Sequence, residues 1–292
     1  MTEKILIVGG DSEIAVATTA HLRNQGHEVL ATTRRPDRVA ANRPFLDLVR
    51  SIADWPVPEG ITGACLCAAI ARLDDCARDP VGSTRVNVTG ITALADKLLQ
   101  RGIPVLFLST DKVFDGSRAH ILADALPCPV SDYGRQKAAA ETALVARIKD
   151  GAPAMILRLA KIVSPGMGLL RGWIASLVAG KPIHPFHDMQ MAPTPVALVA
   201  MAIERLLVAP QPGIVQLSGP RDIAYSELAL CLAEKLGADP RLVNAVSAYS
   251  AGLPAGSTAA HTTLDSSALR ERFGIIVPDA MVVIDELYDS CR

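Results

Sequence analysis

The sequence lacks three features that would each indicate a particular class of protein: a large net charge, a long apolar run and paired cysteine motifs. Its 292 residues include 29 Lys and Arg against 30 Asp and Glu. With no charge excess to attract nucleic acid or an anionic membrane, neither is expected as a partner. The longest apolar stretch, around 196–203, is too short to span a bilayer. No secretory signal is recognised at the start of the chain, so we expect a soluble, cytoplasmic protein.

The six cysteines form no CxxC pairs, which argues against a zinc site. Cys65 and Cys67 alternate with apolar residues, as buried reduced thiols do, and this usage suits a reducing compartment. His184, His187 and Asp188 could be drawn as a metal site. However, prolines interrupt their segment and their spacing is irregular, so no metal is predicted.

Short apolar runs alternate with helical periods in the first half of the chain. Strands are predicted at 5–8, 28–33, 63–69, 103–108 and 154–159, and helices at 14–25, 86–99 and 133–149. Such alternation predicts an α/β fold, a Rossmann-like doubly wound parallel sheet that is covered by helices on both faces.

The alternation of short apolar runs and helical periods changes after about residue 163, where Gly and Pro become frequent and the connections between elements lengthen. We therefore expect residues 1–163 to form a Rossmann domain, with elements near 190–219 returning to its sheet. Residues 164–292 are expected to form mainly a smaller, C-terminal substrate-binding lobe. Later elements are predicted at 196–207 (helix), 214–217 (strand) and 225–236 (helix).

A candidate phosphate-binding turn joins the first strand to the first helix, with the sequence GGDSEIA at 9–15. Turns of this type present backbone N–H groups and a helix N-terminus to a pyrophosphate. Gly9 is present, whereas Ser12 and Ala15 stand where glycine is usual. Both side chains are small enough for the backbone to approach the pyrophosphate closely. An ordinary tight turn is the alternative. The predicted cofactor contacts are Gly9, Asp11, Ser12, Glu13, Ile14, Asp47, Leu48, Ala68 and Ala69.

The end of the second strand distinguishes the two nicotinamide cofactors. A carboxylate there would bind the ribose 2′-hydroxyl of NAD, whereas a nearby arginine accommodates the 2′-phosphate of NADP. This chain has Thr33, Arg34 and Arg35 at that place. A solvated basic loop is the alternative, but the position favours NADP(H) over NAD(H).

A candidate proton-transfer set lies at 110–137. Thr110 follows a buried strand, so it should emerge at the carboxyl edge of the sheet, where ligands bind in such folds. Tyr133 and Lys137 are one helical turn apart on one face. A neutral phenol can protonate a carbonyl oxygen while hydride reaches its carbon, and a neighbouring ammonium stabilises the phenolate that remains. A Tyr–Lys spacing alone is common by chance, whereas its combination with Thr110 and the turn is more specific.

With these residues the chain resembles the extended short-chain dehydrogenase/reductase superfamily (NAD-dependent epimerase/dehydratase type). Within it, the similarity is greatest to the dTDP-4-dehydrorhamnose reductase group. Residues 109–116 (STDKVFDG) are similar to that group's STDYVFDG, and 188–194 (DMQMAPT) to its DQxGxPT. Residues 67–69 (CAA) are similar to its NAA, with Cys67 in place of asparagine. The similarity covers nearly the whole chain.

The resemblance implies that Thr110, Tyr133 and Lys137 are catalytic, that Lys137 also contacts the nicotinamide ribose, and that the substrate is a nucleotide sugar. Lys112 and Lys161 stand where the group has aromatic residues. The lysine at 112 also argues against a 4,6-dehydratase, which carries a glutamate there. The predicted substrate contacts are Asp111, Lys112, Lys161, Arg171 and Thr194.

We therefore predict reduction by NADPH of a keto group on a nucleotide-activated deoxysugar, such as a dTDP-4-keto-6-deoxysugar. Two alternatives stay open at this point. One is a nucleotide-sugar epimerase that retains NAD, which Arg34 and Arg35 disfavour. The other is a non-catalytic nucleotide-binding subunit, which the altered glycine turn permits. A homodimer and a carbonyl substrate other than a nucleotide sugar are also left open.

Overall fold

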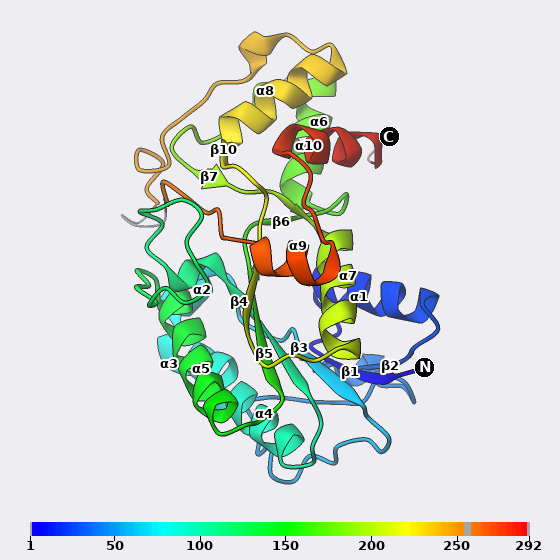
Figure 1. The fold of residues 1–292 in the computed structure, drawn as a ribbon. Helices are drawn as coiled ribbons and strands as arrows, with labels where there is room; N and C mark the ends of the chain where they lie inside the picture. Colours follow the sequence, from blue (N-terminus) through cyan, green and yellow to red (C-terminus); the bar gives the residue numbers. More distant parts are fainter. Residues whose placement is uncertain (1, 254–257, 291–292) are drawn as a thin grey trace.

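Six parallel strands form the central sheet of the computed structural model, which describes residues 2–253 and 258–290 (Figure 1). The strand order is β2-β1-β3-β4-β5-β9, and every neighbouring pair is parallel. These strands are β1 (Lys4–Val8), β2 (Glu28–Ala31), β3 (Gly63–Leu66), β4 (Val105–Thr110), β5 (Ala154–Leu159) and β9 (Gly213–Leu217). The chain leaves β1 first towards β2 and then returns to β3 on its other side. This reversal opens a crevice at the carboxyl ends of β1 and β3 and confirms the predicted Rossmann-like fold.

Helices cover both faces of the sheet, because its strands are apolar on both sides. One face packs against α1 (Glu13–Asn24), α7 (Val196–Val208) and α9 (Ser267–Phe273). The other packs against α4 (Ile91–Leu99) and α5 (Asp132–Lys149). Within β1 the side chains alternate between the two cores: Ile5 and Ile7 join the first, and Leu6 and Val8 join the second.

A smaller lobe lies beyond the carboxyl edge of the sheet, at the top of Figure 1. Its core is built by α6 (Gly168–Val178), α8 (Tyr225–Leu236) and α10 (Ala280–Ser290). Short strand pairs complete this region: β7 (Gln190–Met191) with β10 (Ile223–Ala224), and β6 (Ile162–Val163) with β8 (Thr194–Pro195). The chain therefore enters the lobe three times, since α7 and β9 return to the sheet between α6 and α8, and α9 returns to it between α8 and α10.

Several elements are longer or shorter in the structure than the sequence predicted. The second and third strands end at Ala31 and Leu66, earlier than predicted, because the chain turns into loops that line a cavity there. The helix predicted at 86–99 is part of a longer helical run, with α2 (Leu73–Arg78) and α3 (Pro80–Thr84) before it. This run includes a π-helical segment, η2 (Arg85–Gly90), ahead of α4. Further short turns are η1 (Pro36–Arg38), η3 (Asp111–Val113) and η4 (Pro240–Leu242).

Within the described residues, no helix is long and apolar enough to cross a membrane. Cys65, Cys67, Cys76, Cys128 and Cys231 are free thiols, and Cys291 lies outside the described part of the chain.

Candidate active site

Two adjoining cavities lie along the carboxyl edge of the sheet. The first, of about 560 Å³, lies at the ends of β1 and β2 and between the loops that follow β2 and β3. The second, of about 440 Å³, lies between the ends of β4 and β5 and the smaller lobe. Ser12, Ala69 and Ala71 line both, so the cavities meet at the start of α1. We call them the cofactor cavity and the reaction cavity.

Close packing explains the glycine at the start of the cofactor cavity. Gly9 has a φ of 86°, which favours glycine, and a Cβ built there would lie 2.7 Å from the Cα of Ala68. The Ser12 side chain caps α1 by accepting a hydrogen bond from the Ala15 N–H at 3.3 Å. Serine therefore occupies a usual glycine position as a helix cap and leaves the cavity open.

Two arginines pair with the acidic residue of this turn, and a third lines the cavity beside it. The Asp11 carboxylate pairs with Arg43 and, at 3.2 Å, with Arg38, and it accepts a hydrogen bond from Thr33 Oγ1 at 2.7 Å. Burial acts to raise the pKa of Asp11, but these hydrogen bonds and the charge of Arg43 hold it below its ordinary value. Arg34 lines the cofactor cavity, and within the described residues its side chain has no ion pair. The cavity therefore offers an unpaired cation beside a neutralised carboxylate.

Most of the predicted cofactor residues line this space. The cofactor cavity is lined by Gly9, Asp11, Ser12, Arg34, Asp47, Leu48, Ala68 and Ala69, and Ile14 lines the reaction cavity. Three predicted residues line neither: Glu13 accepts a hydrogen bond from Ser164 Oγ, Thr33 bonds to Asp11, and Arg35 lies outside. Glu13 and Thr33 act instead as links between segments.

The predicted proton-transfer set lies in the reaction cavity. Thr110 is the last residue of β4, and Tyr133 and Lys137 lie on the first turns of α5; all three line the cavity. Thr110 Oγ1 donates to Asp111 Oδ1 at 2.9 Å. Lys137 is 3% exposed; its ammonium donates to the Leu108 carbonyl at 2.5 Å.

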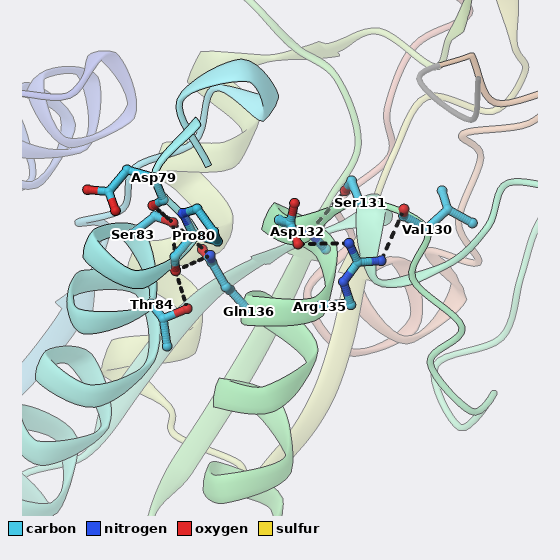
Figure 2. Close-up of polar contacts among 10 residues, drawn as sticks. Asp79, Pro80, Ser83, Thr84, Val130, Ser131, Asp132, Arg135 and Gln136 are labelled. Carbon is cyan, nitrogen blue, oxygen red and sulfur yellow. Dashed lines mark hydrogen bonds and ion pairs between the residues drawn. The ribbon is translucent and has the colours of Figure 1, made fainter. Parts of the chain in front are cut away.

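The start of α5 is fixed by close contacts with its neighbours. A Cβ on Gly134 would lie 2.1 Å from the carbonyl oxygen of Lys112, so glycine lets the helix lie directly against η3. Ser131 caps the helix through the Gly134 N–H at 3.1 Å. Figure 2 shows Gln136 reaching from α5 to α3, where its amide donates to Ser83 Oγ at 2.7 Å. These contacts hold Tyr133 beside Thr110.

Burial gives the two titratable groups opposite shifts. Burial and the Asp111 carboxylate raise the pKa of Tyr133 above its ordinary value, so the phenol is neutral at physiological pH. Burial lowers the pKa of Lys137 to about 7, and Glu141 offsets this in part. A phenolate that formed on Tyr133 would favour the ammonium form of Lys137.

Three of the five predicted substrate residues line the reaction cavity: Asp111, Lys112 and Lys161. The other two do not. Arg171 is exposed and donates to the Pro165 carbonyl, and Thr194 is fully buried behind Lys161. Further lining residues were not among the predicted substrate contacts, although the first three belong to the motif at 188–194: Met189, Gln190, Met191, Tyr225, Ala259 and Thr262.

Tyr225 is the clearest of these missed residues. It begins α8, and its ring contacts Trp173 edge to face at 6.5 Å. Burial and the Asp111 carboxylate raise its pKa to about 12, so it is a second neutral phenol near Asp111. A tyrosine that follows two short strands carries no sequence signal of its own. Within the described residues, no cluster of three or more His, Cys, Asp or Glu side chains could hold a metal ion.

Comparison with protein families finds one match over almost the whole chain: the model described as the RmlD substrate binding domain matches residues 3–291. A probable low-salt glycan biosynthesis reductase, Agl14 of Haloferax volcanii, is 30% identical over 255 residues, which are 81% of each chain. A dTDP-4-keto-6-deoxy-D-glucose reductase of Streptomyces niveus is 28% identical over 252 residues, 84% of this chain and 83% of that protein.

Solved structures share the fold at lower identity. A dTDP-4-dehydrorhamnose reductase of Bacillus anthracis in complex with NADP has a TM-score of 0.81 and 18% identity, covering 99% of this chain and 98% of that one. A UDP-glucose 4-epimerase of Thermus thermophilus in complex with NAD has a TM-score of 0.81 and 22% identity, covering 99% of each.

Proposed function

The chain belongs to the RmlD substrate-binding-domain family, and we propose that it reduces a keto group of a nucleotide-activated deoxysugar, such as a dTDP-4-keto-6-deoxysugar, with NADPH. It is an oxidoreductase of the extended short-chain dehydrogenase/reductase type. The curated relatives named above are reductases, one of them of a dTDP-4-keto-6-deoxysugar, and this supports the substrate class.

One observation carries the proposal: Thr110, Tyr133 and Lys137 line a single cavity that opens into a second cavity beside the phosphate-binding turn. A dinucleotide in the cofactor cavity would bring its nicotinamide to the junction at Ser12 and Ala69. A carbonyl compound in the reaction cavity would then lie between the nicotinamide and Tyr133. This is the arrangement that hydride transfer with simultaneous protonation requires.

The residues of the reaction cavity have protonation states that suit reduction. Bound NADPH would supply the hydride. Tyr133, neutral because burial and Asp111 raise its pKa, donates its proton to the carbonyl oxygen, and Thr110 positions that oxygen by a hydrogen bond. The Lys137 ammonium stabilises the phenolate that is left, which is unfavourable in a buried site without a cation.

The cofactor preference rests on Arg34. Its guanidinium lines the cofactor cavity and has no ion pair in the part of the chain that the structure describes, and Arg38 and Arg43 neutralise Asp11 in the turn. A 2′-phosphate beside Arg34 would therefore meet a cation next to a carboxylate that is already paired, which favours NADP(H) over NAD(H). The solved neighbour with bound NADP supports this choice, and the epimerase with NAD keeps NAD(H) as the alternative.

The test compares two tyrosine variants with the same chemical change. Tyr133→Phe should lower the kcat for NADPH-dependent reduction of a dTDP-4-keto-6-deoxysugar by about 10²- to 10⁴-fold, because the proton donor is lost. NADPH binding, followed by its fluorescence, should change little. Tyr249→Phe, at an exposed tyrosine, is the control and should keep full activity. Full activity of Tyr133→Phe would refute its role.

Further assays on the wild-type protein separate the two alternative functions. An epimerase would release NAD on denaturation and interconvert nucleotide sugars without consuming NADPH. A non-catalytic subunit would bind the cofactor and reduce none of a panel of keto-sugar nucleotides. The location in the cytoplasm, the homodimer and the division at residue 163 stay predictions.

A further inference from the structure

Two lysines enter the reaction cavity from neighbouring strands. Thr110 and Leu159 are paired in the register of β4 and β5. Lys112 and Lys161 each lie two residues beyond this pair, one in η3 and one in the segment after β5, and both line the cavity. The sheet therefore brings the two ammonium groups to the same edge, beside the proposed proton donor.

The charges of these lysines are only partly balanced. Lys112 donates to Asp111 Oδ2 at 2.8 Å. Within the described residues Lys161 has no hydrogen bond or ion pair from its ammonium. Burial and then the charge of Lys112 lower the pKa of Lys161, and Asp111 and Glu13 offset this only in part. Lys161 is thus a half-buried cation that faces a like charge.

The rest of the cavity does not supply the missing anion. Among the described residues, its basic and acidic lining consists of Lys112, Lys137 and Lys161 with a single carboxylate, Asp111. Asp111 already accepts hydrogen bonds from Lys112 and Thr110. A desolvated cation without a partner is unfavourable, so its natural complement is an anion that arrives with a ligand.

We propose that Lys112 and Lys161 together bind an anionic oxygen group of the substrate, a phosphate or a carboxylate, and hold it beside the reacting carbonyl. The inference deepens the proposed function. The placement beside a reacting carbonyl rests on that function, whereas the binding of the anionic group does not. The two sources are the diphosphate of the nucleotide sugar and a carboxylate on its sugar ring. A nucleotide sugar whose deoxysugar is neutral has only the diphosphate.

The experiment measures binding by titration calorimetry with saturating NADP⁺, so that the cofactor phosphates are already in place. Two ligand pairs separate the sources: dTDP against thymidine for the diphosphate, and UDP-glucuronate against UDP-glucose for the sugar carboxylate. The proteins are wild type, Lys161→Gln, Lys161→Arg and, as control, Lys181→Gln at an exposed lysine. Thermal melts of the ligand-free proteins accompany the titrations.

Lys161→Gln should weaken the anion-bearing member of one pair by about tenfold, the value of one charge-assisted hydrogen bond. Weaker binding of dTDP and both UDP-sugars identifies the diphosphate as the bound group. Weaker binding of UDP-glucuronate alone identifies the carboxylate. Lys161→Arg should keep binding, and Lys181→Gln should match wild type. Ligand-free Lys161→Gln should melt no lower than wild type, because an unpaired buried charge is gone.

Three outcomes would overturn the proposal. One is wild-type affinity of Lys161→Gln for every ligand, another is an equal loss for thymidine and dTDP, and the third is the absence of wild-type binding to both dTDP and UDP-glucuronate. Since no turnover is measured, a failure to reduce keto sugars would count against the proposed reduction alone.

Discussion

Arg34 and Arg35 are chain neighbours with different surroundings. Arg34 lines the cofactor cavity, whereas Arg35 does not, and its backbone N–H donates to Thr33 Oγ1 at 3.1 Å. We expect Arg34→Ala to raise the Kd for NADPH by about 10- to 100-fold, because one charge-assisted contact with the 2′-phosphate is lost. The Kd for NADH should change little, since NADH lacks that phosphate.

Arg35→Ala makes the same chemical change one residue further along and serves as the matched control. Fluorescence titrations of both variants with NADPH and NADH measure the preference. Equal losses for the two arginines would contradict a specific role for Arg34 and indicate a diffuse basic surface instead.

Single residues were predictable where the backbone alone sets their position. A residue at the carboxyl end of a buried parallel strand must reach the edge of the sheet, and Thr110 and Ala68 do so. Glu13, within the first turn of α1, illustrates the limit, because the direction of its side chain depends on Ser164, 151 residues away. Local spacing carries no information about such a partner.

At the scale of elements, α5 is tied to the helices beside it by a buried polar network. Gln136 accepts from Asn87 Nδ2 at 2.7 Å and donates to Ser83 Oγ at 2.7 Å (Figure 2 shows the second contact). Asn87, in the π-helical segment, also bonds to the N–H and carbonyl of Ile70, which lines the cofactor cavity. The network thus connects a cavity wall to the helix that carries Tyr133 and Lys137.

We expect Gln136→Leu to lower the free energy of unfolding by about 1–3 kcal/mol, because the buried amides and hydroxyl around it lose a partner. The kcat should fall as well, since α5 is no longer linked to α3. Urea unfolding and steady-state kinetics measure the two effects. Arg135→Leu, which introduces leucine at the exposed neighbour, should lower the free energy of unfolding by less than about 1 kcal/mol. A neutral Gln136→Leu would show that packing alone positions the helix.

The periodic pattern predicted long elements well and short ones poorly. The strand at 154–159 and the helix at 225–236 have the bounds of β5 and α8. By contrast, α2 and α3 are too short to show a helical period, and the sequence did not reveal η2. A π-helical segment depends on packing against neighbours, here Asn87 against Ile70 and Gln136.

At the scale of the molecule, the reaction cavity exists only because two bodies face one another. The sheet supplies Thr110, the helix α5 packed on it supplies Tyr133 and Lys137, and the smaller lobe supplies Tyr225 and Met191. The sequence predicted the sheet half because strand ends define it. It could not predict the lobe half, because nothing in the local pattern near Tyr225 specifies which loop it will meet.

The desolvation of Lys137 in this cavity makes the free energy of unfolding of the whole protein depend on pH. Burial lowers its pKa to about 7 from an ordinary value of 10.5. Between these pH values the unfolded chain binds a proton at Lys137 that the folded chain releases, so folded stability rises with pH. From pH 7 to pH 9 we expect a gain of about 2 kcal/mol from this residue in the free energy of unfolding.

Lys137→Met should remove that gain, because a thioether does not titrate. Urea unfolding at pH 7 and pH 9 of the ligand-free wild type and variant measures the difference in slope, and this subtraction cancels the contribution of Lys161, whose pKa is also lowered. Lys181→Met, at an exposed lysine, should keep the wild-type slope. The range stops at pH 9 because Tyr133, with its raised pKa, reverses the trend once unfolded tyrosines ionise near pH 10. Equal slopes in wild type and Lys137→Met would mean that Lys137 stays charged in the folded protein, where the Leu108 carbonyl would have to stabilise its ammonium.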